Sequence, residues 1–347
     1  MSLFKRTAVA TGWWLWNPKA RLALGFSISP LVVYLVVRDM DWGALSIELH
    51  DFPLRYAIAS LLIFTLATAV RAYRWQVLFV GEKVPLHRLL LVQNAGIGLN
   101  SLSPIRLISE AAQYVLLTLR YRVNKETAAA TLGVQRVLDF VISALLLGVG
   151  LVLLPGLKGF ALYVLGAGVL AIFSLMAVPA IIWFGARPGL ARLPMLASTA
   201  ASLRKLLQAK LKLTWSFLLT LSYWLILGLA AWVLAYGMGI DISLLLATLL
   251  VIATLTFVAL VPSLPASIGT FEFAAYYLLT AFGVAPVEAL GYALVIHAIL
   301  FLPPILVAFL VVVSWLPRKR AQDAAAAEPA SEPATAAESR PASPRSY

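Results

Sequence analysis

The chain has 347 residues, of which 62% are hydrophobic and only 12% are charged. This composition excludes a soluble protein, because no soluble core needs so much apolar side chain, and it predicts a polytopic membrane protein. The formal net charge of +12 does not indicate nucleic-acid binding, because the basic residues cluster in short loops beside apolar runs, where they orient a membrane protein. The chain has no cysteine, which excludes disulfides and thiolate metal sites.

Six apolar runs predict membrane spans, at about 21–37, 54–72, 127–153, 160–184, 213–236 and 289–315; the first is marginal in length. Tryptophans before the first run are typical of interfacial anchors, and no cleavage site follows, so we expect this run to be retained. Two further apolar regions, 86–119 and 242–282, are broken near the middle by proline-containing turns. Each is either two crossings or one hairpin that enters the membrane and returns.

The basic clusters favour hairpins. If every cluster is cytoplasmic, each broken region begins and ends on the same side, and the two enter from opposite sides. The sequence therefore predicts an all-α fold of about six spans and two opposed re-entrant hairpins, with both termini cytoplasmic. The basic residues that carry this argument are Lys5, Arg6, Lys19, Arg21, Arg71, Arg74, Lys83, Arg88, Arg120, Arg122, Lys125, Arg187, Arg192, Arg204, Lys205, Lys210, Lys212, Arg318, Lys319 and Arg320.

The two broken regions contain related sequences. When the chain is shifted by 162 positions, Ser263–Thr280 aligns with Ser101–Thr118, and eight of the 18 positions are identical, among them Glu110 with Glu272. Each half then consists of two spans, a hairpin and a further span, and the two hairpins enter the membrane from opposite sides. This arrangement is the inverted repeat of alternating-access transporters. A helix-breaking proline and an ionisable Glu are costly in lipid, so their repetition indicates a function.

Composition divides the chain into consecutive segments. Residues 190–212 carry five basic residues among leucines, so we expect an amphipathic helix on the cytoplasmic face, attracted to anionic lipid. The end of the chain is rich in Ala, Pro, Glu and Ser without apolar periodicity, which is typical of disorder. The predicted segments are a cytoplasmic N-terminus (1–20), a first half-repeat (21–153, with hairpin 86–119), the first span of the second half (154–189), the basic segment (190–212), the rest of the second half (213–316, with hairpin 242–282) and a disordered cytoplasmic tail (317–347).

Arg106 and Glu110 follow the break in the first hairpin. A helix that begins inside the membrane after Pro104 would direct its free N–H groups and positive dipole end at the centre, which suits an anion such as phosphate. Arg106 is suited to bidentate phosphate binding, and Glu110 is placed to pair with it on one helical face. Glu110 and Glu272 either serve such a site or only complement helix N-termini or a neighbour. Glu272 has no cation in its own copy, so its partner must come from elsewhere in the fold.

Arg136 and Asp139 lie three residues apart on one face of the third predicted span, where we expect them to form an ion pair. The pair is either a structural bridge or part of a polar cavity in which Arg136 binds a lipid headgroup. Arg71 and Arg74 end the second span. They are more typical of snorkelling anchors than of ligands, although a cytoplasmic headgroup would meet them first.

His297 lies inside the last predicted span, where a lone histidine is as often a hydrogen-bonded helix contact as a proton relay. His50 and His87 are loop residues and form no metal-spaced set with it. The sequence has no Ser/His/Asp arrangement, no P-loop and no paired carboxylates for hydrolysis. We therefore expect no enzymatic activity, no cofactor and no metal site.

Four motifs in this order resemble the flippase-like transmembrane region of lysylphosphatidylglycerol synthases, over about residues 20–316: Arg71-Ala-Tyr-Arg-Trp75, Asn100…Pro104…Glu110, Arg136-Val-Leu-Asp139 and Pro265…Gly269…Glu272. The resemblance implies translocation of a lipid with a polar or charged headgroup between leaflets. It does not imply aminoacyl transfer, which belongs to a separate soluble domain of those synthases. The chain departs from the family pattern at Ser109 (usually Gly), at Gln135 (commonly an acid) and at His297 (near a frequent Arg).

These observations together predict a bacterial inner-membrane protein that moves an anionic or polyprenyl-phosphate-linked lipid between leaflets, with membrane lipids as its partners. In this hypothesis the helix N-termini of the hairpins hold the phosphate with Arg106 and Arg136, while the carboxylates of Glu110, Asp139 and Glu272 hold those arginines or an amine. The alternative is a non-transporting scaffold that recruits an envelope glycosyltransferase or lipid synthase. A second rival, a lipid-modifying enzyme, lacks a recognisable catalytic arrangement.

Overall fold

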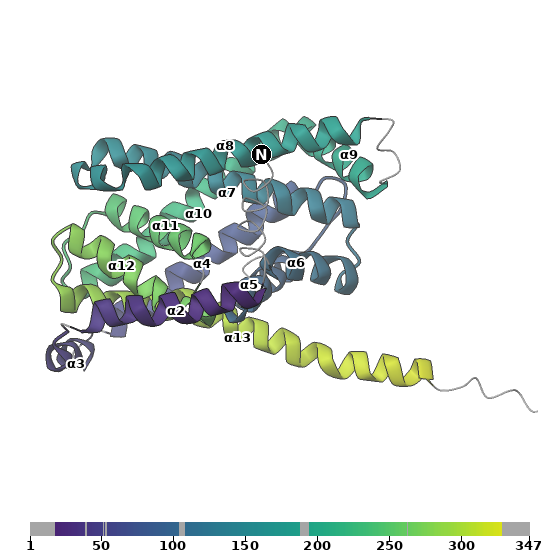
Figure 1. Cartoon of the computed structure of the whole chain (residues 1–347). Helices are drawn as coiled ribbons and strands as arrows, with labels where there is room; N and C mark the ends of the chain where they lie inside the picture. Colours follow the sequence, from purple (N-terminus) through teal and green to yellow (C-terminus); the bar gives the residue numbers. More distant parts are fainter. Residues whose placement is uncertain are drawn as a thin grey trace, which may run out of the picture. The chain divides into compact units, whose positions relative to one another are not determined.

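The computed structural model describes residues 18–38, 40–50, 52, 54–103, 108–187, 194–261 and 263–327. All regular structure in these residues is helical, which confirms the predicted all-α class (Figure 1). The elements in chain order are α2 (Pro18–Val37), α3 (Trp42–His50), α4 (Leu54–Leu78), α5 (Leu86–Leu102), α6 (Ile108–Val115), the π-helical η1 (Leu116–Arg120), α7 (Lys125–Leu153), η2 (Pro155–Phe160), α8 (Ala161–Gly185), α9 (Pro194–Gln208), α10 (Lys210–Gly237), α11 (Leu244–Leu260), η4 (Pro265–Ser267), α12 (Thr270–Ala281) and α13 (Pro286–Ala327).

Within the described residues, five helices are long and apolar enough to cross a membrane: α4, α7, α8, α10 and the Pro286–Ser314 part of α13. The chain is therefore a multi-pass integral membrane protein, as its composition predicts. The predicted first span corresponds to α2, whose apolar part is the shorter Phe26–Val36 and contains Pro30. Whether α2 crosses the membrane stays a prediction.

Each broken region forms two short helices that contact each other, α5 with α6 and α11 with α12. The first arms end at Leu102 and Leu260, just before the prolines, because proline lacks an N–H and restricts the residue before it. The second arm of the second region follows Gly269, whose φ of +83° suits glycine. Paired short helices are compatible with hairpins, but the re-entrant path and the inverted repeat stay predictions.

The two halves of the chain meet along α4 and α10, which pack together. The hydroxyl of Ser60 donates to the carbonyl of Ala230 across this contact, at 2.8 Å. The two hairpins also touch, because α5 contacts η4 at the tip of the second one. Gly98 of α5 lies so close to the carbonyl of Pro304 in α13 that any side chain there would overlap it.

The predicted basic segment 190–212 contains α9 and the start of α10. Leu203 and Leu206 of α9 are buried in a cluster with Leu78 and Val134, so the apolar face of this helix packs on α4 and α7. Its basic residues, such as Arg204, remain exposed. Residues 190–193 lie outside the described part of the chain.

Helix α13 continues through Ala327, so the predicted start of the disordered tail at 317 is wrong for residues 317–327. Arg, Lys, Gln and Ala dominate this stretch, and these residues have high helix propensity. The prediction relied on apolar periodicity, which does not detect a helix formed by such residues. Residues 310–347 form a unit of their own. The predicted N-terminal anchors at 1–17 and the tail beyond 327 fall outside the described residues.

The topology can be tested with single cysteines, because the chain contains none. We expect the thiol of Ala285→Cys, in the exposed loop before α13, to react with an impermeant maleimide on intact cells. The thiol of Gln208→Cys, at the exposed end of α9, should react only after permeabilisation. If both thiols reacted from the same side, the loop before α13 would not lie outside the cell, and the predicted path of α10 and the second hairpin would be wrong.

Candidate functional site

Asp139 of α7 is the centre of a buried charge cluster. Its carboxylate accepts two hydrogen bonds from Arg74 of α4, with Nη1–Oδ1 and Nη2–Oδ2 distances of 2.6 and 3.0 Å. Such a bidentate contact is among the strongest that side chains form. A second arginine of α4, Arg71, has its Nη2 3.6 Å from Oδ2. The prediction that Asp139 pairs with Arg136 is therefore wrong, because α4 presents two arginines to the same carboxylate.

Arg74 has no exposed surface at all. Its guanidinium also donates to the hydroxyl of Thr220 in α10 at 3.0 Å and to the side-chain carbonyl of Gln135 at 3.4 Å. The ring of Tyr223 lies beneath both arginines, 5.3 Å from Arg71 and 5.8 Å from Arg74. A snorkelling anchor would reach water, so that interpretation is wrong for Arg74, which instead joins α4, α7 and α10.

Arg136 forms its ion pair with Glu110 of α6. This contact ties the first hairpin to α7, the helix that carries Asp139. The Arg136 side chain is 42% exposed, against 18% for Arg71 and 0% for Arg74, so it is the most accessible cation of the three. Arg106, the predicted partner of Glu110, lies outside the described residues, and its role stays a prediction.

The cluster carries more positive than negative charge. Counted over the described residues, it contains three arginines and two carboxylates, which leaves one excess positive charge (three minus two). In addition, Nε of Arg71, Nε of Arg74 and Nε2 of Gln135 are buried without a hydrogen-bond acceptor among the described residues. Buried donors without acceptors are costly. An anion with several oxygens, such as phosphate, would supply both the missing charge and the missing acceptors.

A stripe of polar residues along α7 leads through this cluster. The stripe consists of Thr127, Thr131, Gln135, Asp139 and Ser143, which recur every four residues over about 24 Å; consecutive members share a face, and the series winds gradually around the helix. All but the first are buried. Sequence reasoning singled out only Asp139, but a search for polar residues at helical spacing within an apolar span would have found the stripe.

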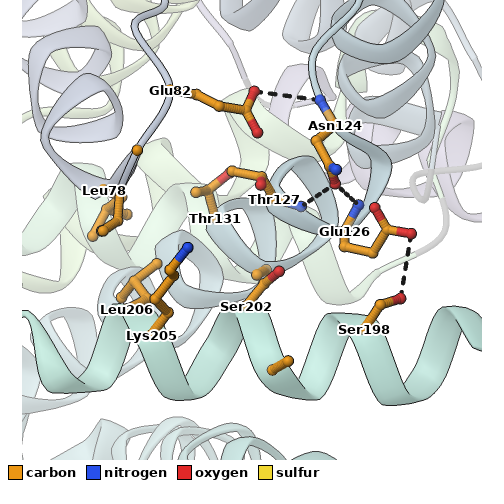
Figure 2. Close-up of a pocket in the computed structure, with 14 residues that line it drawn as sticks. Leu78, Glu82, Asn124, Glu126, Thr127, Thr131, Ser198, Ser202, Lys205 and Leu206 are labelled. Atoms are coloured by element: carbon orange, nitrogen blue, oxygen red, sulfur yellow. Dashed lines mark hydrogen bonds between the residues drawn. The ribbon is translucent and has the colours of Figure 1, made fainter.

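A pocket of about 380 Å³ lies at one end of the stripe, where α4 ends, α7 begins and α9 crosses (Figure 2). Thr127 and Thr131 contribute to its lining, and Lys205 reaches toward it from α9. Two carboxylates border it. Glu82 accepts from the backbone N–H of Asn124, and Glu126 accepts from the hydroxyl of Ser198, both at 3.3 Å. The pocket is therefore a polar opening with charges of both signs, directly before the buried part of the stripe.

Glu272 contacts a histidine rather than an arginine. Its Oε1 lies 2.5 Å from Nδ1 of His297 in α13, and its Oε2 accepts from the backbone N–H of Gly269 at 2.7 Å. This confirms that the partner of Glu272 comes from outside its own copy of the repeated motif. His297 therefore forms a hydrogen-bonded contact between helices, one of the two roles that its position in the last span suggested.

Comparison with known proteins gives one family. The family model described as lysylphosphatidylglycerol synthase TM region matches residues 22–308. No curated protein matches the chain. Because the matched residues are most of the chain, the chain belongs to this family, which confirms the resemblance seen in its motifs. Membership indicates a membrane protein in a lipid-related process.

Replacing Asp139 with alanine should destabilise the protein strongly, because Arg74 would be left buried without a counter-charge. We expect a loss of about 3–5 kcal/mol in the free energy of unfolding, measured by denaturant titration in detergent micelles. The double variant Arg74→Met with Asp139→Leu removes both charges and should recover most of the loss. Wild-type stability of Asp139→Ala would show that this ion pair does not hold α4 against α7.

Proposed function

We propose that this member of the family moves an anionic lipid, or a polyprenyl-phosphate-linked lipid, between the leaflets of the bacterial inner membrane without changing it covalently. The observation that carries the proposal is the arginine cluster, with its excess positive charge and its buried donors that lack acceptors. Charged side chains at membrane depth are rare, and they mark substrate pathways when they face a cavity or the bundle interior. A headgroup phosphate is the ligand that this set of donors fits best.

In this proposal the headgroup enters at the polar pocket and follows the stripe on α7. The pocket offers hydroxyls and charges of both signs, so a polar headgroup can leave water there without losing all its hydrogen bonds. It then meets Arg136, the most exposed arginine, before the more deeply buried Arg71 and Arg74. Arg136 pairs with the Glu110 carboxylate until a headgroup phosphate replaces that carboxylate as its partner.

The lipid tails need different surroundings, and a neighbouring face of α7 provides them. An apolar groove of about 550 Å³ is formed by residues of α7, α8, α9 and α10. Val134 and Leu138 line this groove, while the adjacent Gln135 and Asp139 belong to the polar stripe. One helix can thus guide the headgroup on one face while an acyl chain stays in apolar surroundings beside it.

The proposal is tested in proteoliposomes that hold lipids with a fluorescent label, by the fraction of label that a membrane-impermeant quencher can reach over time. We expect wild-type protein to equilibrate a labelled phosphatidylglycerol or polyprenyl phosphate between leaflets faster than a labelled zwitterionic lipid. Arg136→Ala should lose most of this transfer, because it removes the accessible cation and leaves the cluster without excess charge.

Arg187→Ala is the matched control, because Arg187 is exposed in the loop after α8 and stacks on Trp183 away from the cluster. This variant should transfer lipid at the wild-type rate. Equal transfer by Arg136→Ala and wild type would remove the cluster from the mechanism. Absence of transfer by wild type, together with an intact cellular phenotype in Arg136→Ala, would favour the scaffold function instead.

A further inference from the structure

The imidazole of His297 contacts the second hairpin through both of its ring nitrogens, and these contacts determine how many protons the site holds. His297 lies between two oxygens, with Nδ1 2.5 Å from Oε1 of Glu272 and Nε2 2.8 Å from the carbonyl oxygen of Ala266. The carbonyl can only accept, so Nε2 must carry a hydrogen. Nδ1 then either carries a second hydrogen and donates to the carboxylate, or accepts one from a protonated carboxyl group.

Both arrangements contain one proton more than a neutral imidazole beside a carboxylate. Without that proton, one of the two contacts brings two lone pairs together. The other carboxylate oxygen is already committed to the N–H of Gly269 and cannot relieve the conflict. The His297 and Glu272 side chains are only 10% and 13% exposed, so water cannot readily replace the lost hydrogen bond. The geometry is therefore that of a pair with a bound proton.

The backbone that this pair holds is the tip of the second hairpin, and it is strained. Ala266 and Ser267 have φ values of +57° and +61°, a region that non-glycine residues seldom adopt unless their surroundings hold them. The carbonyl bound by His297 belongs to Ala266, one of these two residues. The tip also contacts α5 and donates a hydrogen bond to another helix, from the N–H of Leu264 to the hydroxyl oxygen of Ser29 in α2 at 3.1 Å.

The same contact occurs in the first half of the chain with a permanent cation. The shift of 162 positions that places Glu110 on Glu272 brings Arg136 to position 298, next to His297. In each half, the Glu on the second hairpin helix pairs with a side chain of the helix that follows. Arginine is always charged, whereas histidine is a cation only when a proton is bound. The contact is thus permanent in one half and dependent on a proton in the other.

We propose that Glu272 and His297 form a proton-binding site that keeps the tip of the second hairpin closed, and that release of the proton opens it. Coupling of this step to lipid movement rests on the function proposed above. Glu272 also lines a pocket of about 200 Å³. The other lining residues come from α2, α3, α13 and the tip, and they are apolar or glycine. A proton that enters this pocket can therefore bind to the carboxylate of Glu272.

Other titratable groups near the site do not share its contacts in the part of the chain that the structure describes. The rings of Phe271 and Phe301 cover the imidazole, with centroids 4.6 and 4.4 Å away. The titratable side chains described on the surrounding helices are Tyr34 of α2, His50 of α3, His87 and Arg88 of α5, Tyr276 and Tyr277 of α12, and Glu288 and Tyr292 of α13, while α11 has none. The Tyr292 hydroxyl is bound to the carbonyl of Ala231, and His87 and Arg88 lie at the opposite end of α5 from Gly98 and the break.

The test measures opening of the tip without any lipid transport. Ser267 is buried in the tip, so the thiol of Ser267→Cys should react slowly with a water-soluble maleimide when the tip is closed. We expect its rate to rise several-fold between about pH 5.5 and about pH 8.5, which bracket the range in which histidine titrates. Each rate is divided by that of Ala285→Cys, an exposed thiol, to remove the intrinsic pH dependence of the chemistry.

Two variants should remove this pH dependence and leave the thiol slow to react at both values. Glu272→Gln places an amide that donates to Nδ1 while its oxygen accepts from Gly269, so every contact is satisfied without the extra proton. His297→Arg supplies the permanent cation found in the first half. The variant His297→Ala should react quickly at both pH values. A constant normalised rate in the parent protein, or an unchanged pH dependence in Glu272→Gln, would overturn the proposal.

Lipid transfer in proteoliposomes forms a separate arm. If the site is coupled to transport, transfer should depend on pH in the wild type and should lose that dependence in Glu272→Gln. pH-dependent labelling in a protein that transfers no lipid would leave the proton site standing and would count against the proposed transport function alone. Transport with an unchanged pH profile in Glu272→Gln would overturn the coupling.

Discussion

The bidentate contact between Asp139 and Arg74 fixes the positions of the central helices. A guanidinium with no exposed surface cannot remain in an apolar interior without a counter-charge, so α4 and α7 must meet where these two residues lie. The uncharged hydroxyl of Thr220 in α10 accepts a hydrogen bond from the same guanidinium, so a third helix also packs at this position. Glu110 then pairs with Arg136, the most exposed of the three arginines, which a ligand can contact.

The two halves of the chain use the same kind of contact with different chemistry. If the halves were identical, exchanging their conformations would give two states of equal free energy, and neither state would be favoured. In the predicted inverted repeat, residues that differ between the halves would therefore set the balance between the states. The Glu110–Arg136 and Glu272–His297 contacts differ in whether the cation needs a proton. The difference lies in the contacts that join each hairpin to the next helix, where it can affect the balance most directly.

Apolar runs and prolines predicted most of the fold, because helix length in lipid and the effect of proline on a helix are local properties. The sequence also singled out Glu110, Arg136, Asp139 and Glu272 as residues too costly to be accidental. It failed on the pairing of Asp139 with Arg136. Spacing along α7 made Arg136 the natural partner of Asp139, but the rotation of α4, which presents Arg74 instead, depends on packing between helices distant in sequence.

The proposed movement of a lipid places two opposite demands on one path, and α7 shows how both can be met. A charged headgroup needs polar partners at every depth, whereas acyl chains need surroundings without them. A residue spacing of four places Thr131, Gln135 and Asp139 on neighbouring turns of one side of the helix, while Val134, Val137 and Leu138 face an apolar groove. Beside Gln135 and Asp139 the two surfaces lie next to each other, so a lipid that straddles them at this depth would keep its headgroup and its tails in suitable surroundings. The excess positive charge beside Asp139 then determines which headgroups gain from entering, since an anion completes the cluster and a cation would be repelled by it.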